Sequence, residues 1–134
     1  MIEQQLWHYT CNHSRTLIGR NGFLLPPMAW QADRFMDRIN DLDGLLQASL
    51  VWLTDLDEPD IDGLGLTSHI LRCDRSQHRY RVLSNRGVIP FGQIQHKFSA
   101  SGQASLLTAA ARPEHWFVSF NRVPVEYAAI ASVA

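Results

Sequence analysis

The sequence predicts one α+β domain built mainly of short strands. Apolar or alternating runs occur near both ends of the chain, and helix signals are scattered between them instead of following every strand. Of 134 residues, 46% are hydrophobic, which is enough for one core but would leave two domains with too little each. We therefore expect a single domain over residues 1–134, with a compact mixed or antiparallel sheet and a few short helices.

The first strand is the clearest element. Leu6, His8 and Thr10 fall on one side of an extended chain, and Trp7 and Tyr9 fall on the other. This alternation is typical of a strand with two different faces. The chemistry of this strand therefore depends on which face each side chain occupies.

The rest of the chain contains shorter signals. The run 48–54 is apolar on both sides, which predicts a strand inside a sheet. Residues 101–111 predict a late helix, with Pro113 just beyond its end. The other expected elements are a helix after Asn12 or Ser14 that stops at Asn21-Gly22, a helix or ordered loop over 28–47 with a turn at 41–44, a polar connection over 55–65, and strands over 68–73, 79–83, 96–99, 115–120 and 125–133.

Composition argues against several protein classes. No apolar stretch approaches the roughly 20 residues of a membrane span, and residues 1–5 do not resemble a signal peptide, so we expect a cytoplasmic protein. Cys11 and Cys73 are more typical of buried thiols than of a disulfide framework. The common nucleotide, hydrolase and zinc motifs do not occur, and the six histidines show no clear ligand spacing. We predict no metal site.

Charge is distributed unevenly although the net charge is only −1. Residues 33–62 carry nine acids and two arginines, whereas residues 69–97 carry six cations and one acid. We expect one acidic and one basic face. Eleven of the twelve cations are arginine, a residue that binds phosphate with two parallel hydrogen bonds, although codon bias also explains this preference.

The opening of the chain resembles a known enzyme family. Leu6-Trp7-His8-Tyr9-Thr10, a short helix and Gly22-Phe23-Leu24-Leu25-Pro26 are similar to the first strand, helix and short strand of ADP-ribosyltransferases of the diphtheria-toxin and poly(ADP-ribose) polymerase type. The resemblance implies that His8, Tyr9 and Thr10 hold the ribose and nicotinamide amide of NAD⁺. It also implies that family's split-sheet fold.

Two further motifs extend the resemblance. Val51-Trp52-Leu53-Thr54-Asp55 looks like the strand whose aromatic stacks on nicotinamide, with Trp52 where that family has Tyr. Val125-Glu126-Tyr127 looks like the strand that carries the catalytic Glu. Among the four glutamates, Glu126 alone lies in an apolar strand-like run, which favours the same residue independently.

These residues fit the cleavage of the nicotinamide–ribose bond. The reaction passes through an oxocarbenium-like ribose, which a nearby carboxylate stabilises. The resemblance implies an NAD-consuming enzyme with Glu126 and His8 as catalytic residues, and with arginines of the basic stretch, Arg75 among them, on the pyrophosphate. The ADP-ribose acceptor would be a protein or a nucleic acid.

The sequence also allows other interpretations of these residues. His8 could be a structural histidine, Trp52 a core aromatic, and Glu126 an ion-pair partner of Arg122. A relative of the RNA 2′-phosphotransferases is an alternative enzyme on the same fold. A non-enzymatic regulatory protein that binds its partner through the acidic or the arginine-rich face is an alternative from another class.

Overall fold

The structure, a computed structural model, describes residues 3–10, 18, 22–26, 42–64, 75 and 77–130. Its strands are β1 (Trp7–Thr10), β2 (Phe23–Leu24), β3 (Val51–Thr54), β4 (His78–Val82), β5 (Ile89–Pro90), β6 (Trp116–Ser119) and β7 (Val123–Tyr127). Its helices are α4 (Leu42–Ala48), α5 (Ile61–Leu64) and α6 (Ala100–Leu106), with the 3-10 helices η1 (Phe91–Gln93), η2 (Gln95–Lys97) and η3 (Pro113–His115).

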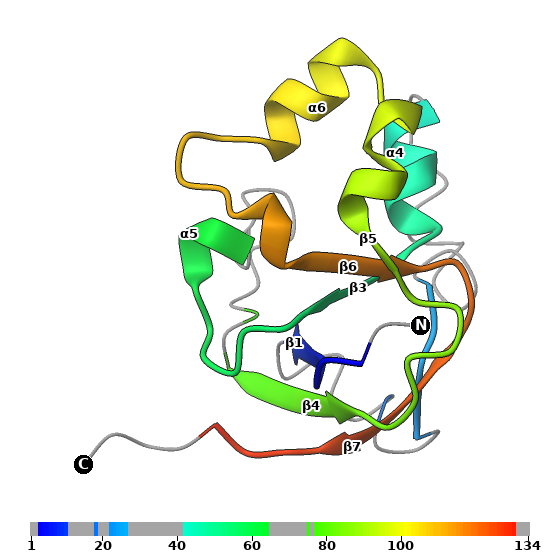
Figure 1. Ribbon diagram of the computed structural model, residues 1–134, viewed down its shortest axis with the longest axis vertical. Coiled ribbons are helices and arrows are strands. Elements are labelled where there is room, and N and C mark those ends of the chain that lie inside the picture. Colours follow the sequence, from blue (N-terminus) through cyan, green and yellow to red (C-terminus); the bar gives the residue numbers. More distant parts are fainter. Residues whose placement is uncertain are drawn as a thin grey trace.

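The strands form one curled sheet in the order β2-β7-β4-β1-β3-β6-β5, and all the pairings among the described strands are antiparallel. Helices α4 and α6 lie beyond β6, at the opposite end of the molecule from β7 (Figure 1). This arrangement confirms the α+β class. In the described part of the chain, no helix is long and apolar enough to cross a membrane.

Each face of the sheet is covered by its own core. Neighbouring residues of a strand point to opposite faces, so Leu53 and Phe117 enter one core while Trp116 and Val118 enter the other. The first core lies along β1, β4 and β7, and its members include the fully buried Leu6. The second core lies beneath the helices around β6 and contains Leu50, Phe91, Ile94, Phe98, Trp116 and Val118.

A hydrogen-bonded cap joins α4 to α6. The Ser99 hydroxyl accepts a hydrogen bond of 3.1 Å from the Gly102 amide, which caps the N-terminus of α6. Asp43 in α4 in turn accepts a 2.8 Å bond from the Ser99 amide and a bond from the Ser99 hydroxyl. These bonds hold the pKa of Asp43 below its usual value. The two helices are thereby fixed over the second core.

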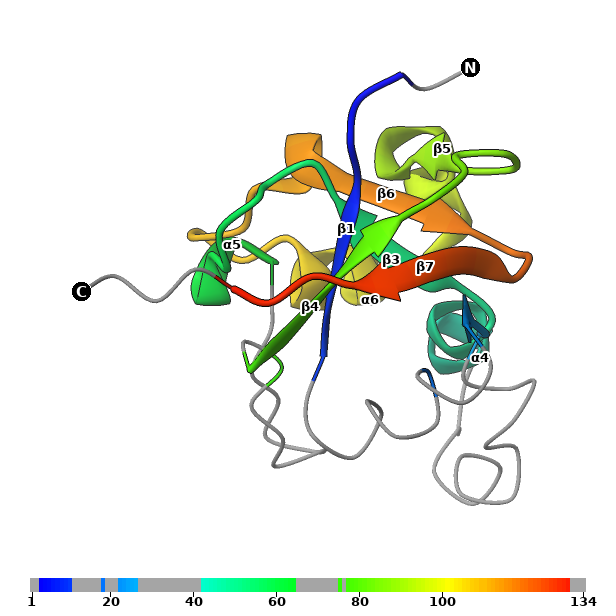
Figure 2. The same ribbon diagram turned by 90° about the horizontal axis from the view of Figure 1, so that it is seen from below.

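The sheet is continuous on one side of β1 and nearly broken on the other. Strand β1 pairs with β4 at four consecutive positions, but its only pair with β3 is Trp7 with Thr54. Beyond Trp7 the backbones of β1 and β3 separate, and the next residue along β1 is His8. Figure 2 shows the two strands crossing at an angle. The backbone pairing of β1 with β3 therefore ends at Trp7.

Most of the strand predictions match the structure. Strands β1, β4 and β6 confirm the predictions over 5–10, 79–83 and 115–120, and β3 is an interior strand as expected. The late helix is confirmed but ends at Leu106, and the last strand begins at Val123 and ends at Tyr127. Gly22 adopts φ 68°, as its predicted role in stopping a helix requires, and its amide bonds the Ile18 carbonyl.

Three local predictions differ from the structure, and others cannot be compared. Residues 96–99 form η2 and a cap instead of a strand, because Phe91, Ile94 and Phe98 lie at the three- and four-residue spacing of a helical face. The expected turn at 41–44 falls at the start of α4. The expected polar connection at 55–65 contains α5. The predictions for 11–17, 28–41 and 68–73, with both cysteines, lie outside the described residues.

Candidate functional site

His8 lies where β1 and β3 separate. Its Nδ1 is 2.7 Å from the backbone carbonyl oxygen of Trp52, on the facing strand. A carbonyl oxygen only accepts hydrogen bonds, so Nδ1 carries the proton and donates it. This bond ties the two strands together through a side chain at a point where the backbone ladder has ended.

The surroundings of His8 keep its imidazole neutral. Burial, opposed by the bond to Trp52 and reinforced by the nearby charge of Arg75, lowers the His8 pKa from 6.5 to about 4. With the proton fixed on Nδ1, the Nε2 atom of a neutral ring is a hydrogen-bond acceptor. His8 is therefore arranged to accept a hydrogen bond from a hydroxyl group at neutral pH.

Thr10 and Arg75 are the two predicted site residues that the structure brings to the side of His8. Thr10 is buried and lies two residues beyond His8 on the same face of β1. Arg75 precedes β4, whose first residue, His78, pairs with Thr10. The Arg75 guanidinium is close enough to His8 to lower its pKa, and burial lowers the pKa of Arg75 itself. A half-buried cation thus lies beside a neutral imidazole.

Tyr9 and Trp52 face away from this region. The Tyr9 hydroxyl donates a 2.9 Å bond to the carbonyl of Leu56, and burial raises the Tyr9 pKa to about 12. The Trp52 ring packs against the second core, with its centroid 5.6 Å from the Phe91 ring and 6.2 Å from the Trp116 ring. The contacts of Trp52 are those of a core aromatic, one of the two interpretations that its sequence allowed.

Glu126 lies on the opposite face of the sheet from His8. Directly paired residues of an antiparallel sheet point to the same side, and Glu126 pairs with Arg81, which pairs with Trp7. His8 belongs to the alternate row. The Glu126 carboxylate forms an ion pair with Arg81, and both side chains are largely exposed. Arg122, the partner considered from the sequence, lies instead over the ring of Phe23, 4.8 Å from its centroid.

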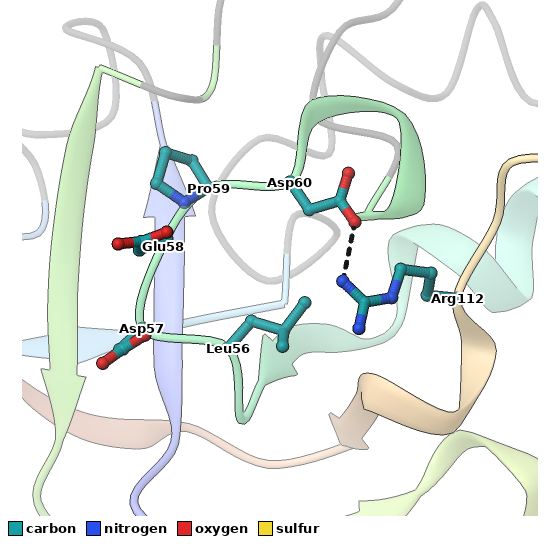
Figure 3. A pocket seen from close by; sticks show the side chains of 6 residues that line it. All are labelled: Leu56, Asp57, Glu58, Pro59, Asp60 and Arg112. Carbon is teal, nitrogen blue, oxygen red and sulfur yellow. Dashed lines mark hydrogen bonds and ion pairs between the residues drawn. The ribbon is translucent and has the colours of Figure 1, made fainter.

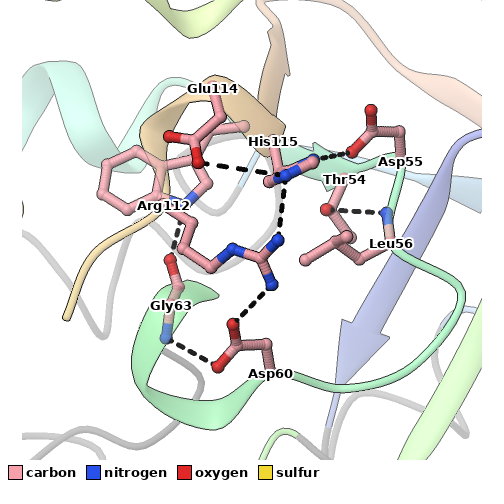
Figure 4. A network of polar contacts seen from close by, with 9 residues as sticks. Thr54, Asp55, Leu56, Asp60, Gly63, Arg112, Glu114 and His115 are labelled. Atoms are coloured by element: carbon pink, nitrogen blue, oxygen red, sulfur yellow. Dashed lines mark hydrogen bonds and ion pairs between the residues drawn. The ribbon is translucent and has the colours of Figure 1, made fainter.

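A polar network that the sequence analysis did not find joins the ends of β3 and β6 (Figure 4). Asp55 follows β3 and accepts a 2.6 Å bond from Nδ1 of His115, which precedes β6. Nε2 of His115 lies 3.1 Å from Arg112, and Arg112 bonds Asp60 at 3.0 Å. Because arginine only donates, Nε2 of His115 accepts this bond. The network depends on the pairing of β3 with β6, which brings Asp55 and His115 together and which a single sequence does not display.

The network borders a small polar cavity of about 220 Å³ (Figure 3). Its lining residues are Leu56, Asp57, Glu58, Pro59, Asp60 and Arg112. The Asp60 carboxylate packs closely against Gly63, where a Cβ would lie only 2.3 Å from a carboxylate oxygen, so a larger residue there would displace Asp60. Both nitrogens of His115 are engaged in the network, so we interpret it as a structural tie. In the described residues, no group of three His, Cys, Asp or Glu is placed to bind a metal ion.

Comparisons with protein-family models, with curated proteins and with solved structures found no match. The described structure puts Thr10 on the His8 face of β1 and Arg75 close enough to His8 to lower its pKa, whereas Tyr9, Trp52 and Glu126 lie on the opposite face. His8 supplies a neutral acceptor and Arg75 a cation, which together are suited to a ligand with hydroxyl and phosphate groups, whereas Thr10 is a buried neighbour on the same face.

Proposed function

We propose that this protein consumes NAD⁺, cleaving the nicotinamide–ribose bond and transferring ADP-ribose to a macromolecular acceptor. The observation that carries the proposal is the tautomer of His8, fixed by its bond to the Trp52 carbonyl where β1 and β3 separate. An acceptor nitrogen at that point suits a ribose hydroxyl, which is the role that the resemblance of the first strand assigns to His8. The split-sheet fold of the ADP-ribosyltransferases is part of the same proposal.

Arg75 supports the binding of the pyrophosphate. An arginine that is half-buried beside His8 is screened less by salt than an exposed one, so it contributes more to an anion contact. NAD⁺ carries its pyrophosphate next to the ribose that His8 would hold. The two side chains therefore match adjacent parts of one ligand.

A phosphate acceptor is the second candidate, and the position of Glu126 favours it. With its carboxylate on the opposite face and paired with Arg81, Glu126 is not placed to activate a nucleophile beside His8. A phosphate monoester is already largely ionised at neutral pH and needs no such activation. Its oxygen would bond to the anomeric carbon of the ribose as the bond to nitrogen breaks, and neutral nicotinamide would leave with the electron pair. This is the chemistry of the RNA 2′-phosphotransferase-like alternative.

The direct test is nicotinamide release from NAD⁺, measured by chromatography with wild-type protein and with His8→Gln. We expect release by the wild type and a loss on the order of a hundredfold in the variant, the cost of mispositioning a reacting group. His96→Gln is the matched control, because His96 is an exposed histidine outside the proposed site. Equal rates for the two variants would remove His8 from the site.

The acceptor classes are separated in the same assay. Stimulation by an oligonucleotide that ends in a 2′-phosphate, but not by its dephosphorylated form, would favour phosphate transfer. Label transferred from NAD⁺ to lysate proteins would favour a protein acceptor. If wild-type protein neither binds NAD⁺ nor releases nicotinamide with any acceptor, the proposed function is wrong.

A further inference from the structure

An aromatic pair outside the predicted site lies on the same face of the sheet as His8. Tyr80 pairs with His8 on one side and with Tyr127 on the other, so the three side chains form one cross-strand row. Tyr80 is almost fully buried at 2% exposure, whereas Tyr127 is 43% exposed. The row therefore runs from His8, next to β3, across β4 to the partly exposed ring of Tyr127 on β7.

The Tyr127 ring is held in position from two sides. Its centroid lies 5.5 Å from the Tyr80 ring in an edge-to-face arrangement with a 77° angle between the planes. Its hydroxyl and Nδ1 of His78 are joined by a hydrogen bond of 3.1 Å, and the His78 and Tyr127 rings are 5.8 Å apart. A ring fixed in this way loses little conformational freedom when a planar group stacks on it.

Spacing along the sheet relates this ring to the proposed ligand. Two strand spacings separate His8 from Tyr127, or roughly 10 Å between backbones. The His8 ring leans the other way, toward Trp52 on β3, which increases the separation of the side chains. Arg75, three residues before His78 in the sequence, lies close enough to His8 to lower its pKa. The distance is too long for a base attached directly to the ribose at His8 and suits the far end of a dinucleotide.

We propose that Tyr127, supported by His78 and Tyr80, forms the subsite for the adenine base of the dinucleotide. The inference rests on the proposed function. It gives the ligand a direction, with the nicotinamide ribose at His8, the pyrophosphate beside Arg75 and the adenine on Tyr127. Adenine has a large π-face, and an aromatic side chain binds such a base by stacking without reading its edges.

The test compares ligands that contain different parts of NAD⁺. Calorimetric titration gives the affinities of ADP-ribose and of nicotinamide mononucleotide for wild type, Tyr127→Ala and Tyr127→Phe. Tyr127→Ala should weaken ADP-ribose binding on the order of 5- to 150-fold, the range for loss of one base-stacking aromatic, and leave mononucleotide binding within about twofold. Tyr127→Phe retains the stacking ring and should bind ADP-ribose nearly as well as wild type.

Phe120→Ala is the matched control, because Phe120 is 42% exposed and lies beyond β6. Tyr127→Leu gives a second variant that preserves apolar contacts if the alanine variant does not fold by circular dichroism. Equal effects on ADP-ribose from the Tyr127 and Phe120 variants would overturn the adenine subsite while the proposed function stands. Loss of mononucleotide binding in a folded Tyr127 variant would overturn it as well. Wild-type protein that binds neither ligand would overturn both proposals.

Discussion

The two faces of the ribbon formed by β7, β4 and β1 show opposite ways of accommodating polar groups. On one face, Trp7, Arg81 and Glu126 form a cross-strand row in which the charged side chains pair with each other. On the other, His8, Tyr80 and Tyr127 form a row of rings in which Tyr80 belongs to the first core. Successive rows of the same three strands point to opposite faces of the sheet.

On the face that carries Arg81 and Glu126, both arginines of β4 already have partners within the protein. Arg81 is bound by Glu126, and Arg79 lies 4.3 Å from the centre of the Trp7 ring while donating to the carbonyls of Asp57, Ala128 and Ala129. On the other face, Nδ1 of His8 donates a hydrogen bond to the Trp52 carbonyl, and Nε2 is the acceptor nitrogen of the ring. We therefore place the proposed ligand chemistry on the His8 face, where the polar groups are not already paired as Arg81 is with Glu126.

The largest effect that we expect is a loss of stability when Trp52 is replaced. Trp52→Ala should lower the free energy of unfolding by about 3 kcal/mol, since the ring packs on Phe91 and Trp116 in the second core. Urea denaturation measures this loss, and Trp7→Ala, at a half-buried surface tryptophan, should cost less. A folded Trp52→Ala variant with unchanged stability and weakened NAD⁺ binding would return Trp52 to the nicotinamide contact that the resemblance assigns to it.

The pH dependence of stability tests the neutral state of His8. The pKa of His8 is about 4 in the folded protein and 6.5 is its usual value, so between these limits the unfolded chain binds more protons. The contribution of His8 is fully present above pH 6.5 and is lost as the pH falls toward 4, by at most about 3 kcal/mol. Subtracting the unfolding free energies of His8→Gln from those of the wild type isolates the effect. A flat difference over this range would place His8 in solvent.

Arg75 provides an intermediate test on ligand binding. Arg75→Gln should raise the Kd for NAD⁺ by roughly 10- to 100-fold, the effect of losing a charge-assisted hydrogen bond in a half-buried position. Arg86→Gln removes an exposed arginine from the same basic stretch and should act only through salt-screened attraction, which disappears at high ionic strength. Equal, salt-sensitive losses in both variants would make the stretch a general basic surface.

The sequence predicted the positions of the strands better than it predicted how the strands pair. Alternation along residues 6–10 and the apolar run 51–54 contain enough information to identify β1 and an interior β3. The face occupied by Glu126 depends on the register of β7 against β4, and a shift of one residue would move it to the face of the sheet that carries His8. Register is set by contacts between distant segments, which a single sequence does not display. For the same reason, the sequence could predict neither the packing of Trp52 in the second core nor the cross-strand alignment of Tyr127 with Tyr80 and His8.

The smallest effect that we expect is that of Glu126→Gln on activity, and it tests directly whether Glu126 is catalytic, as the family resemblance implies. A catalytic Glu126 predicts that Glu126→Gln lowers nicotinamide release at least about a hundredfold with little change in NAD⁺ affinity. The structure leads us to expect less than a threefold change in release, because the carboxylate faces away from His8 and binds Arg81. Stability should fall by roughly 0–1 kcal/mol, as for an exposed ion pair, and Arg81→Gln should have a similar effect. Combining both substitutions should cost little more than either alone, because each removes the same interaction. A hundredfold loss of turnover in a folded Glu126→Gln protein, with Arg81→Gln fully active, would instead assign the chemistry to the charged face.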